Sequence, residues 1–471
     1  GNAVSQTQGT WAELLSPAYA APAGMFTLGI TLHAFNVFIA ATTMPAAAGE
    51  IGTTALLSWT TSAYLIASIA GGAAAASLKA AFGARHVLYL CSAVFMAGTA
   101  VFALAESAPV VIVGRCLQGF GEGVVVAACY TLIPEIFPKR LVPHVFAAES
   151  VVWVVAALGG PLVAGAIAEF WSWRVAIAVS LPASLIFVAL VPLCVPKRTA
   201  SAAAKVAIPV VQLALVVAAI FLLSLSGEVV DRAASSVSLA AGALLLAFVL
   251  VTDKRRATRL FPANAFRLSD PMGAGLLLVA LMTFVEALPA VYVAFMGQKL
   301  WALNALEAGF LHATIAISWS VTAIAVAHMP RLAVAAYVWP APLLMAAGLG
   351  SEVGALQWAS LPLAVAGQVL IGASFGLSWA RLCEHVMEVA PEAERDFAAA
   401  ALPTILSAGL AVGAAFFGAL AGWSELQPAL PPTDIAAILV PLFTIGTVVA
   451  AVSTVVALRA TRSVHVPVPA L

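Results

Sequence analysis

Apolar stretches long enough to cross a bilayer alternate with short polar stretches along the whole chain. An α-helix rises about 1.5 Å per residue, so about 20 apolar residues span the hydrocarbon core of a membrane. The pattern therefore predicts fourteen membrane-spanning helices. Their expected ranges are 24–46, 56–78, 86–105, 109–132, 144–168, 173–195, 207–227, 235–252, 272–297, 305–328, 333–350, 358–386, 397–422 and 434–458.

The composition agrees with a polytopic membrane protein built from helices. Hydrophobic residues make up 63% of the chain and charged residues 9%, which is more apolar surface than a soluble protein buries. A transmembrane barrel would show short alternating segments instead. We therefore predict an all-α fold. Its expected parts are a six-helix bundle at 24–195, a linker with two extra helices at 196–271, a second six-helix bundle at 272–459, and terminal segments at 1–23 and 460–471.

The connections between the predicted helices alternate in charge. Lysines and arginines gather on one side, at Lys79, Arg85, Lys139, Arg140, Lys197, Arg198, Lys205, Lys254, Arg255, Arg256, Arg259, Arg267, Arg331, Arg395, Arg459 and Arg462. The opposite connections are mainly acidic, at Glu50, Glu106, Glu169, Glu228, Asp231, Glu352 and Glu425. Basic loops stay in the cytoplasm, so both termini are expected there.

The fourth predicted helix carries the strongest site signal. At 100° per residue, Arg115, Gln118 and Glu122 form one narrow polar stripe, with Gly119 and Gly123 along one side and Gly121 on the other. Such glycines allow neighbouring helices to approach closely. A charge in hydrocarbon is costly, so the stripe should face protein or a wet cavity. It is a candidate functional site, and the alternative is a buried ion pair that only fixes helix packing.

A short internal repeat divides the chain into two halves. AGQVLIGASFG at 366–376 matches VGRCLQGFGEG at 113–123, and Gln368 stands where Arg115 stands. Two copies of a six-helix unit would explain the match. The two extra helices lie between these copies and lack a polar stripe, with Gln212 and Ser224 as their main polar interior residues. They are expected to pack at the periphery.

Over nearly its whole length the chain resembles the major facilitator superfamily, and specifically the fourteen-helix drug:proton antiporter branch. The most specific motif is Arg115-x-x-Gln118-Gly119-x-Gly121-x-Gly123 in the fourth helix. Further similar motifs are Gly159-Gly160-Pro161-x-x-x-Gly165, Trp173-Arg174, the basic stretch DKRRATRLFPANAF and Ala308-Gly309.

The resemblance implies two six-helix bundles around a central cavity that opens to each side of the membrane in turn. It implies proton-coupled secondary transport that exports amphipathic organic molecules, by a monomer in a bacterial inner membrane. The expected partners are a small-molecule substrate, protons and the lipid bilayer, with no nucleic acid. No nucleotide-binding or cofactor motif is present, so we expect neither a cofactor nor enzymatic activity.

Two positions depart from the family pattern. Where the family usually has an aspartate nine residues before a proline, this chain has Asn36 before Pro45. The loop after the second helix lacks the acid of the family motif and has Ala80 there. In the family that acid holds the cytoplasmic gate shut, so the departure puts this latch in doubt.

Three residues are the candidates for proton coupling: Glu122, Arg115 and Glu286. Burial and a nearby arginine act in opposite directions on a carboxyl group, so a conformational change can move its proton. Glu286 lies at mid-depth, three residues before Pro289, which should kink that helix. The alternative for Glu286 is a protonated structural carboxyl.

Residues expected to line the substrate cavity are His33, Asn36, Tyr64, Gln118, Tyr130, Tyr292, His312, Trp319 and Trp379. Histidines in such positions are often packing residues, and aromatic residues near helix ends are often interfacial anchors. A gate is expected at Arg381, Glu384 and Glu149, with a solvated rim as the alternative. The histidines lack metal-site spacing, so no metal centre is expected.

Two other functions remain open from the sequence. The chain could be a carrier for one defined metabolite or a metal-chelating organic acid, with Arg115 gripping a carboxylate. It could also be a non-transporting receptor or assembly protein on a transporter scaffold, because Asn36 and Ala80 replace two acids of the family.

Overall fold

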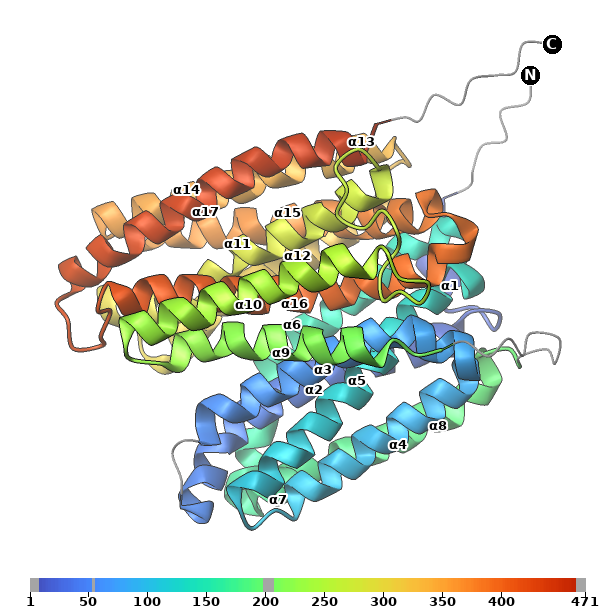
Figure 1. Ribbon diagram of the computed structural model, residues 1–471, viewed down its shortest axis with the longest axis horizontal. Helices are drawn as coiled ribbons and strands as arrows, with labels where there is room; N and C mark the ends of the chain where they lie inside the picture. The colour runs from blue at the N-terminus through green and yellow to red at the C-terminus, as the bar shows by residue number, and fades with distance from the viewer. Residues whose placement is uncertain (1–7, 53–55, 198–206, 463–471) are drawn as a thin grey trace.

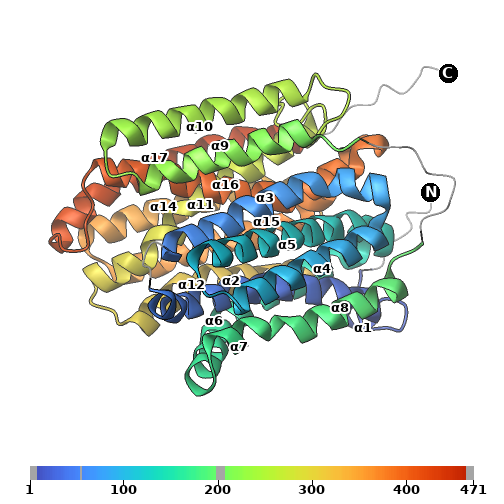
Figure 2. The same ribbon diagram turned by 60° about the horizontal axis from the view of Figure 1, so that its bottom comes forward.

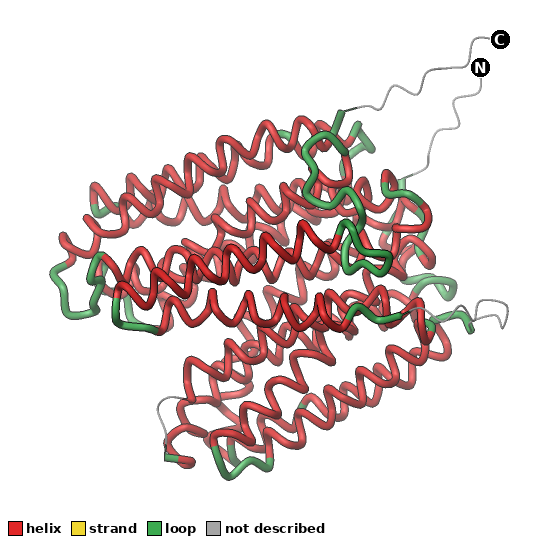
Figure 3. The backbone as a smooth tube through the Cα atoms, viewed as in Figure 1, coloured by secondary structure: helices red, strands yellow, loops and turns green. Residues whose placement is uncertain are grey.

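The computed structural model describes residues 8–52, 56–197 and 207–462, and these residues form helices and loops without strands (Figure 3). Fourteen helical segments are long and apolar enough to cross a membrane, which confirms the predicted number. The first half contains α1 Trp11–Leu14, α2 Ala20–Ile51, α3 Leu56–Phe82, α4 Ala84–Ala103, α5 Ala108–Ile136, η1 Lys139–Leu141, α6 Val142–Phe170, α7 Trp173–Ala178 and α8 Ser180–Cys194.

The second half follows two additional helices, α9 Val210–Glu228 and α10 Arg232–Asp253. It contains α11 Pro271–Leu300, α12 Ala305–His328, α13 Val334–Val338, α14 Pro340–Trp358, α15 Leu361–Val389, η3 Glu392–Glu394, α16 Arg395–Trp423 and α17 Pro432–Ala460. Each pair α7–α8 and α13–α14 forms one membrane span.

The two halves meet at the end of the molecule where the described chain begins and ends, and they diverge toward the far end (Figure 1). We call these the near end and the far end. The halves meet where α3 and α5 pack on α16 and where α6 packs on α12. Gly72 of α3 lies against the Thr404 side chain of α16, and Ala147 of α6 clusters with Ala323 and Ala327 of α12.

Glycines on both sides of α5 bring it into backbone contact with its neighbours. A Cβ atom on Gly119 or Gly123 would overlap a carbonyl oxygen of α3, and one on Gly121 would lie 2.6 Å from the Cys91 carbonyl oxygen of α4. The prediction that glycines flank the polar stripe and allow close packing is therefore confirmed.

The same packing recurs in the second half. Gly372 of α15 lies against the Ile315 carbonyl of α12, as Gly119 of α5 lies against α3. Gly367 approaches the Gly348 carbonyl of α14, where a Cβ atom would be 2.7 Å from the oxygen. The repeat in the sequence therefore corresponds to a repeat in the packing.

The additional helices α9 and α10 lie side by side along one edge of the molecule (Figure 2). Apolar residues of α9, including Val216 and Ile220, pack with Ile69 of α3 and Ala411 of α16. These helices are peripheral, as expected, and α9 also covers the seam between the halves.

One acidic residue lies elsewhere than the charge pattern predicted. Glu352 was expected in a loop, but it lies inside α14 with an exposed fraction of 0%. The sequence predicts a loop there because a single acid interrupts an apolar run, but α14 continues to Trp358. Burial inside the bundle lets the helix carry this carboxyl group.

Candidate functional site

The polar stripe of α5 is buried inside the first half, and its arginine is bound by neutral groups. The Arg115 guanidinium donates to Gln118 Oε1 (3.0 Å) and to the Thr60 carbonyl oxygen (3.3 Å). Its central carbon lies 4.3 Å from the centre of the Tyr64 ring, a cation–π contact. Gln118 donates in turn to Thr99 Oγ1 (3.0 Å). The network holds Arg115 against α3 and α4.

Glu122 has no cation bonded to it among the described residues. Its exposed fraction is 2%, and its Oε1 atom has no hydrogen-bond partner in the described part of the chain. The described ion pairs do not include one between Glu122 and Arg115. The buried ion pair considered from the sequence is therefore not how Arg115 is held.

A second polar group continues the stripe into α2. His33 Nδ1 and the Tyr64 hydroxyl are 2.8 Å apart, and the His33 ring meets the Trp153 ring of α6 edge to face. Asn36 is buried beside Tyr64, and its Nδ2 atom has no partner among the described residues. The structure thus brings together five predicted residues, namely His33, Asn36, Tyr64, Arg115 and Gln118.

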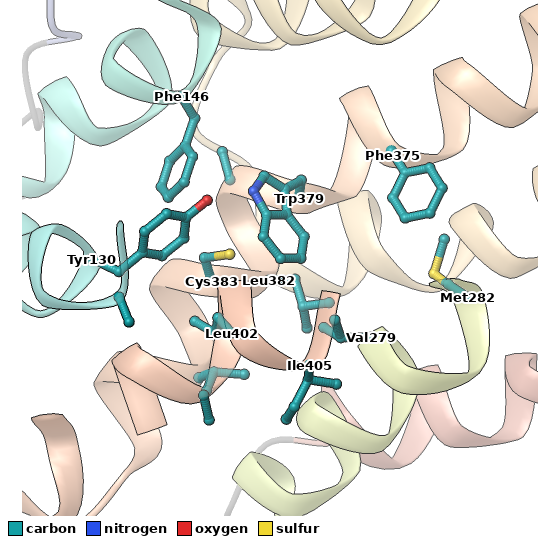
Figure 4. Close-up of a cluster of buried hydrophobic side chains, with 14 of the residues drawn as sticks. Tyr130, Phe146, Val279, Met282, Phe375, Trp379, Leu382, Cys383, Leu402 and Ile405 are labelled. Atoms are coloured by element: carbon teal, nitrogen blue, oxygen red, sulfur yellow. The ribbon is translucent and has the colours of Figure 1, made fainter. Parts of the chain in front are cut away.

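Glu286 lies on a face of α11 that is turned toward the inside. It is half-buried, four residues after Met282 and seven after Val279, so the three share one helix face. Figure 4 shows Val279 and Met282 among Ile405 of α16 and other buried side chains. The carboxyl group of Glu286 is therefore directed to the protein interior, one turn further toward the far end.

Tyr130 and Trp379 face each other where the two halves meet (Figure 4). Tyr130 is 1% exposed, and its hydroxyl donates to Glu149 Oε1 of α6 at 3.0 Å. The Trp379 indole nitrogen of α15 points toward the same hydroxyl. Glu149, predicted as a gate residue, therefore belongs to this buried contact.

The remaining predicted cavity residues are spread over the second half. Trp319 of α12 stacks on Phe375 with ring centres 4.7 Å apart. The Tyr292 hydroxyl donates to the Phe417 carbonyl oxygen (3.3 Å). His312 is half-buried, and its Nδ1 atom has no partner among the described residues. These residues do not join the cluster around Tyr64.

Arg381 and Glu384, two of the three residues expected at the gate, form an ion pair within α15. Arg381 Nη1 donates to Glu384 Oε2 at 3.1 Å, three residues along α15. Arg331 also bonds to Glu384, and it donates to the Lys139 carbonyl oxygen of the first half at 3.0 Å. The residue opposite the pair is thus Lys139 rather than Glu149.

Lys79, which lies one residue before the acidic position of the family motif, forms ion pairs at the near end. Lys79 Nζ lies 2.8 Å from Glu135 of α5 and 3.1 Å from Asp396 at the start of α16. Ala80 stands at the motif's acidic position. An ion pair across the halves is therefore present, and here the first half supplies a lysine to it instead of the acid of the family motif.

The Trp173-Arg174 pair ties three helix ends together at the far end. Trp173 Nε1 donates to Glu50 Oε2 (2.6 Å), and Arg174 donates to the carbonyl oxygens of Ala103 and Ala105 (2.8 and 2.7 Å). The Trp173 hydrogen bond, helped by Arg174, lowers the pKa of Glu50 below its ordinary value. This explains why a tryptophan and an arginine stand together here.

Sequence reasoning missed two features. The first is a pair of buried polar side chains: both carboxylate oxygens of Glu352 and the Oε1 atom of Gln368 lack partners among the described residues. The internal repeat, which places Gln368 at the position of Arg115, is the sequence signal that could have indicated a polar site there. Trp11 of α1 donates to His328 of α12 (3.2 Å) and packs edge to face on His144 of α6. No local sequence pattern predicted that the first segment contacts both halves.

Two bundles of six spans, each with glycine-mediated packing and the first with a buried polar stripe, form an α-helical membrane-protein fold. The family model described as Major Facilitator Superfamily matches residues 26–351, and the chain belongs to that superfamily. Its fourteen spans fit the drug:proton antiporter branch. Members of the family are transporters and not enzymes.

Relatives and solved structures agree with this assignment. A probable multidrug-efflux transporter of Mycobacterium tuberculosis strain H37Rv is 31% identical over 424 residues, which cover 87% of this chain and 89% of the relative. The human organic anion transporter MFSD10 (TETRAN) has a similar fold, with a TM-score of 0.66, 14% identity, and coverage of 92% of this chain and 100% of that one. The proton:xylose symporter XylE has a TM-score of 0.63, 16% identity, and coverage of 91% and 94%.

Proposed function

We propose that this protein is a proton-coupled transporter that exports amphipathic organic compounds by alternating access. The observation that carries the proposal is a pair of carboxyl groups, Glu122 and Glu286, placed on inward faces of the two halves without a cation bonded to them among the described residues. A lone carboxylate is costly away from water. Binding or releasing a proton therefore changes the relative free energy of the two conformations.

The arrangement of the halves supports a state that is closed toward the cytoplasm. The near end holds the basic Lys79, Lys139 and Arg331, and basic loops remain cytoplasmic. The halves are joined by ion pairs there and diverge at the far end (Figure 1). We infer that both termini are cytoplasmic and that the far end opens outward.

The aromatic residues support an amphipathic substrate. Tyr64, Trp153 and Trp319 lie on α3, α6 and α12, which are helices that pack across the junction of the halves. Aromatic faces bind apolar molecules and organic cations. The mycobacterial relative is named a probable multidrug-efflux transporter, which supports the same class. A monomer in a bacterial inner membrane is part of the proposal.

The test is transport of ethidium by the purified protein in proteoliposomes under an imposed pH gradient. Glu122→Gln keeps the shape of the side chain but cannot titrate, so it should abolish gradient-driven accumulation while ethidium binding is retained. Parent-like accumulation by the variant between about pH 6 and 8, where a coupling group must exchange its proton, would leave Glu122 as a packing residue. Coupling would then have to be sought at Glu286.

Arg115→Lys is the companion variant. It keeps the positive charge but loses the planar fork that contacts Gln118, the Thr60 carbonyl and the Tyr64 ring. Transport should fall although the charge remains.

Asn36→Asp, in contrast, should be tolerated and should change the pH dependence of transport. A single tight ligand in place of a broad substrate range would favour a carrier for one metabolite.

A further inference from the structure

Glu149 is a carboxyl group buried at the junction of the two halves, on the near side of the polar stripe. Its exposed fraction is 8%, and its Oε1 atom accepts the hydrogen bond from Tyr130. Its Oε2 atom has no partner among the described residues. The first half supplies both residues, Tyr130 from α5 and Glu149 from α6.

The second half covers this carboxyl group from the other side. In Figure 4, Trp379, Cys383 and Leu402 stand opposite Tyr130 and Phe146. Cys383 of α15 is fully buried and lies close enough to Glu149 to interact with it electrostatically. When α15 and α16 move away from α5 and α6, the side chains that shield the Glu149 carboxyl group from water move away with them.

The titratable groups that face Glu149 are neutral ones. They are Tyr130 and Cys129 on α5 and Cys383 on α15. No charged or titratable side chain of α1, α2, α7 or α12, which also pack on α6, interacts with Glu149 in the described part of the chain. No lysine, arginine or histidine among the described residues therefore compensates a carboxylate at this position.

We propose that Glu149 is a proton-binding site whose protonation holds the two halves together at the cytoplasmic side. The inference rests on the proposed function for its role in transport. With the halves closed, Glu149 is the neutral acid and Tyr130 donates to its Oε1. When the halves part, water reaches the carboxyl group, the O–H bond breaks, and the proton passes to cytoplasmic water. The carboxylate that remains is stabilised by hydration.

Glu352 provides a matched control because it is as deeply buried but lies within one half. It sits between α14 and α15, against the backbone of Gly367. Moving the halves apart as rigid bodies leaves its surroundings unchanged. Titration of Glu352 should therefore have no influence on the closure of the near end.

The experiment measures the separation of the halves by electron–electron double resonance. Spin labels are attached through ketone-bearing residues at Phe82 of α3 and Leu458 of α17, two exposed positions on different halves near the cytoplasmic end. The full-length protein is measured in lipid nanodiscs over a pH series. The parent should show a short distance at acid pH and a growing population of a longer distance at alkaline pH.

Glu149→Gln should keep the short distance at every pH, and Glu352→Gln should follow the parent. The inference is overturned if the parent distance does not respond to pH, if Glu149→Gln follows the parent, or if both variants lose the response. Ethidium accumulation in proteoliposomes is measured in parallel, where Glu149→Gln should lose gradient-driven accumulation and keep exchange. If the parent fails to accumulate ethidium but its distance still responds through Glu149, only the proposed function fails.

Discussion

At the scale of single residues, the buried acids share one property and differ in where they lie. Glu122, Glu149 and Glu352 are each buried without a bonded cation among the described residues. Desolvation makes the charged form of each costly. Glu122 lies within the polar stripe, Glu149 at the junction of the halves and Glu352 inside one half. Their different positions, rather than their burial, are the basis of the different roles that we propose for them.

The glycines of α5 allow a prediction about stability. Gly123→Ala places a Cβ atom on the Ser68 carbonyl, so α3 and α5 must move apart. Overpacking of this kind costs about 1–3 kcal/mol. Thermal unfolding in detergent should show a lower midpoint for this variant.

The control for that prediction is Gly24→Ala. Gly24 is exposed in α2, and a Cβ atom there would meet nothing within 4 Å. Its unfolding midpoint should be equal to or above that of the parent, because alanine favours a helix. Equal midpoints for Gly123→Ala and the parent would contradict the prediction, because α3 and α5 would then move apart at no cost in stability.

At the scale of elements, the first segment of the chain joins both halves at the near end. Trp11 contacts His144 of α6 and His328 of α12, and Arg140 Nε donates to Glu13 Oε1 at 2.9 Å. The Arg140 hydrogen bond lowers the pKa of Glu13 below its ordinary value of 4.5. Because Trp11 contacts both halves, one of its two contacts must break when the near end parts, and the Arg140–Glu13 bond holds the segment on the first half.

The lowered pKa predicts how the segment responds to acid. A carboxyl group with a lowered pKa stabilises the bound state at pH values above its ordinary pKa. This stabilisation is lost as the pH falls through the lowered pKa. A spin label at the exposed Leu15 should therefore become more mobile only below the ordinary range of a glutamate. In Glu13→Gln the label should be mobile at every pH, and equal mobility in parent and variant would exclude a role for the Arg140 contact.

At the scale of the whole molecule, closure of the near end depends on contacts between the halves. Lys79 is the most enclosed cation among these, with a side chain that is 10% exposed, and it bridges Glu135 and Asp396. The pair of Lys139 and Glu388 is mostly exposed, at 61% and 53%. Exposed pairs contribute about 0–1 kcal/mol, so Lys79 should dominate the closure.

Lys79→Met should shift the conformational equilibrium toward separation of the halves. Loss of the cation leaves Glu135 and Asp396 close together without compensation, which favours parting. The distance between the labels at Phe82 and Leu458 should show a larger open population at fixed pH. Lys139→Met is the matched control and should change this population little. A larger effect from Lys139 than from Lys79 would contradict the assignment.

Much of the fold was predictable because hydrophobic length and helical period are local properties. Fourteen spans follow from apolar stretches that match the bilayer. The faces of Gly119, Gly121 and Gly123 follow from 3.6 residues per turn. The Arg381–Glu384 contact was also predictable, because three residues bring two side chains together on any helix.

The sequence by itself determined the number of spans, the charge asymmetry, the repeat and the inward faces of the polar residues. Only the tertiary structure decided which partners those residues meet. Arg115 lies on Tyr64 and not on Glu122, Glu149 bonds to Tyr130, and Lys79 reaches Asp396 across the halves. Such contacts join residues far apart in the chain. They depend on the rotation of each helix and on the angle between the bundles, which no local pattern contains.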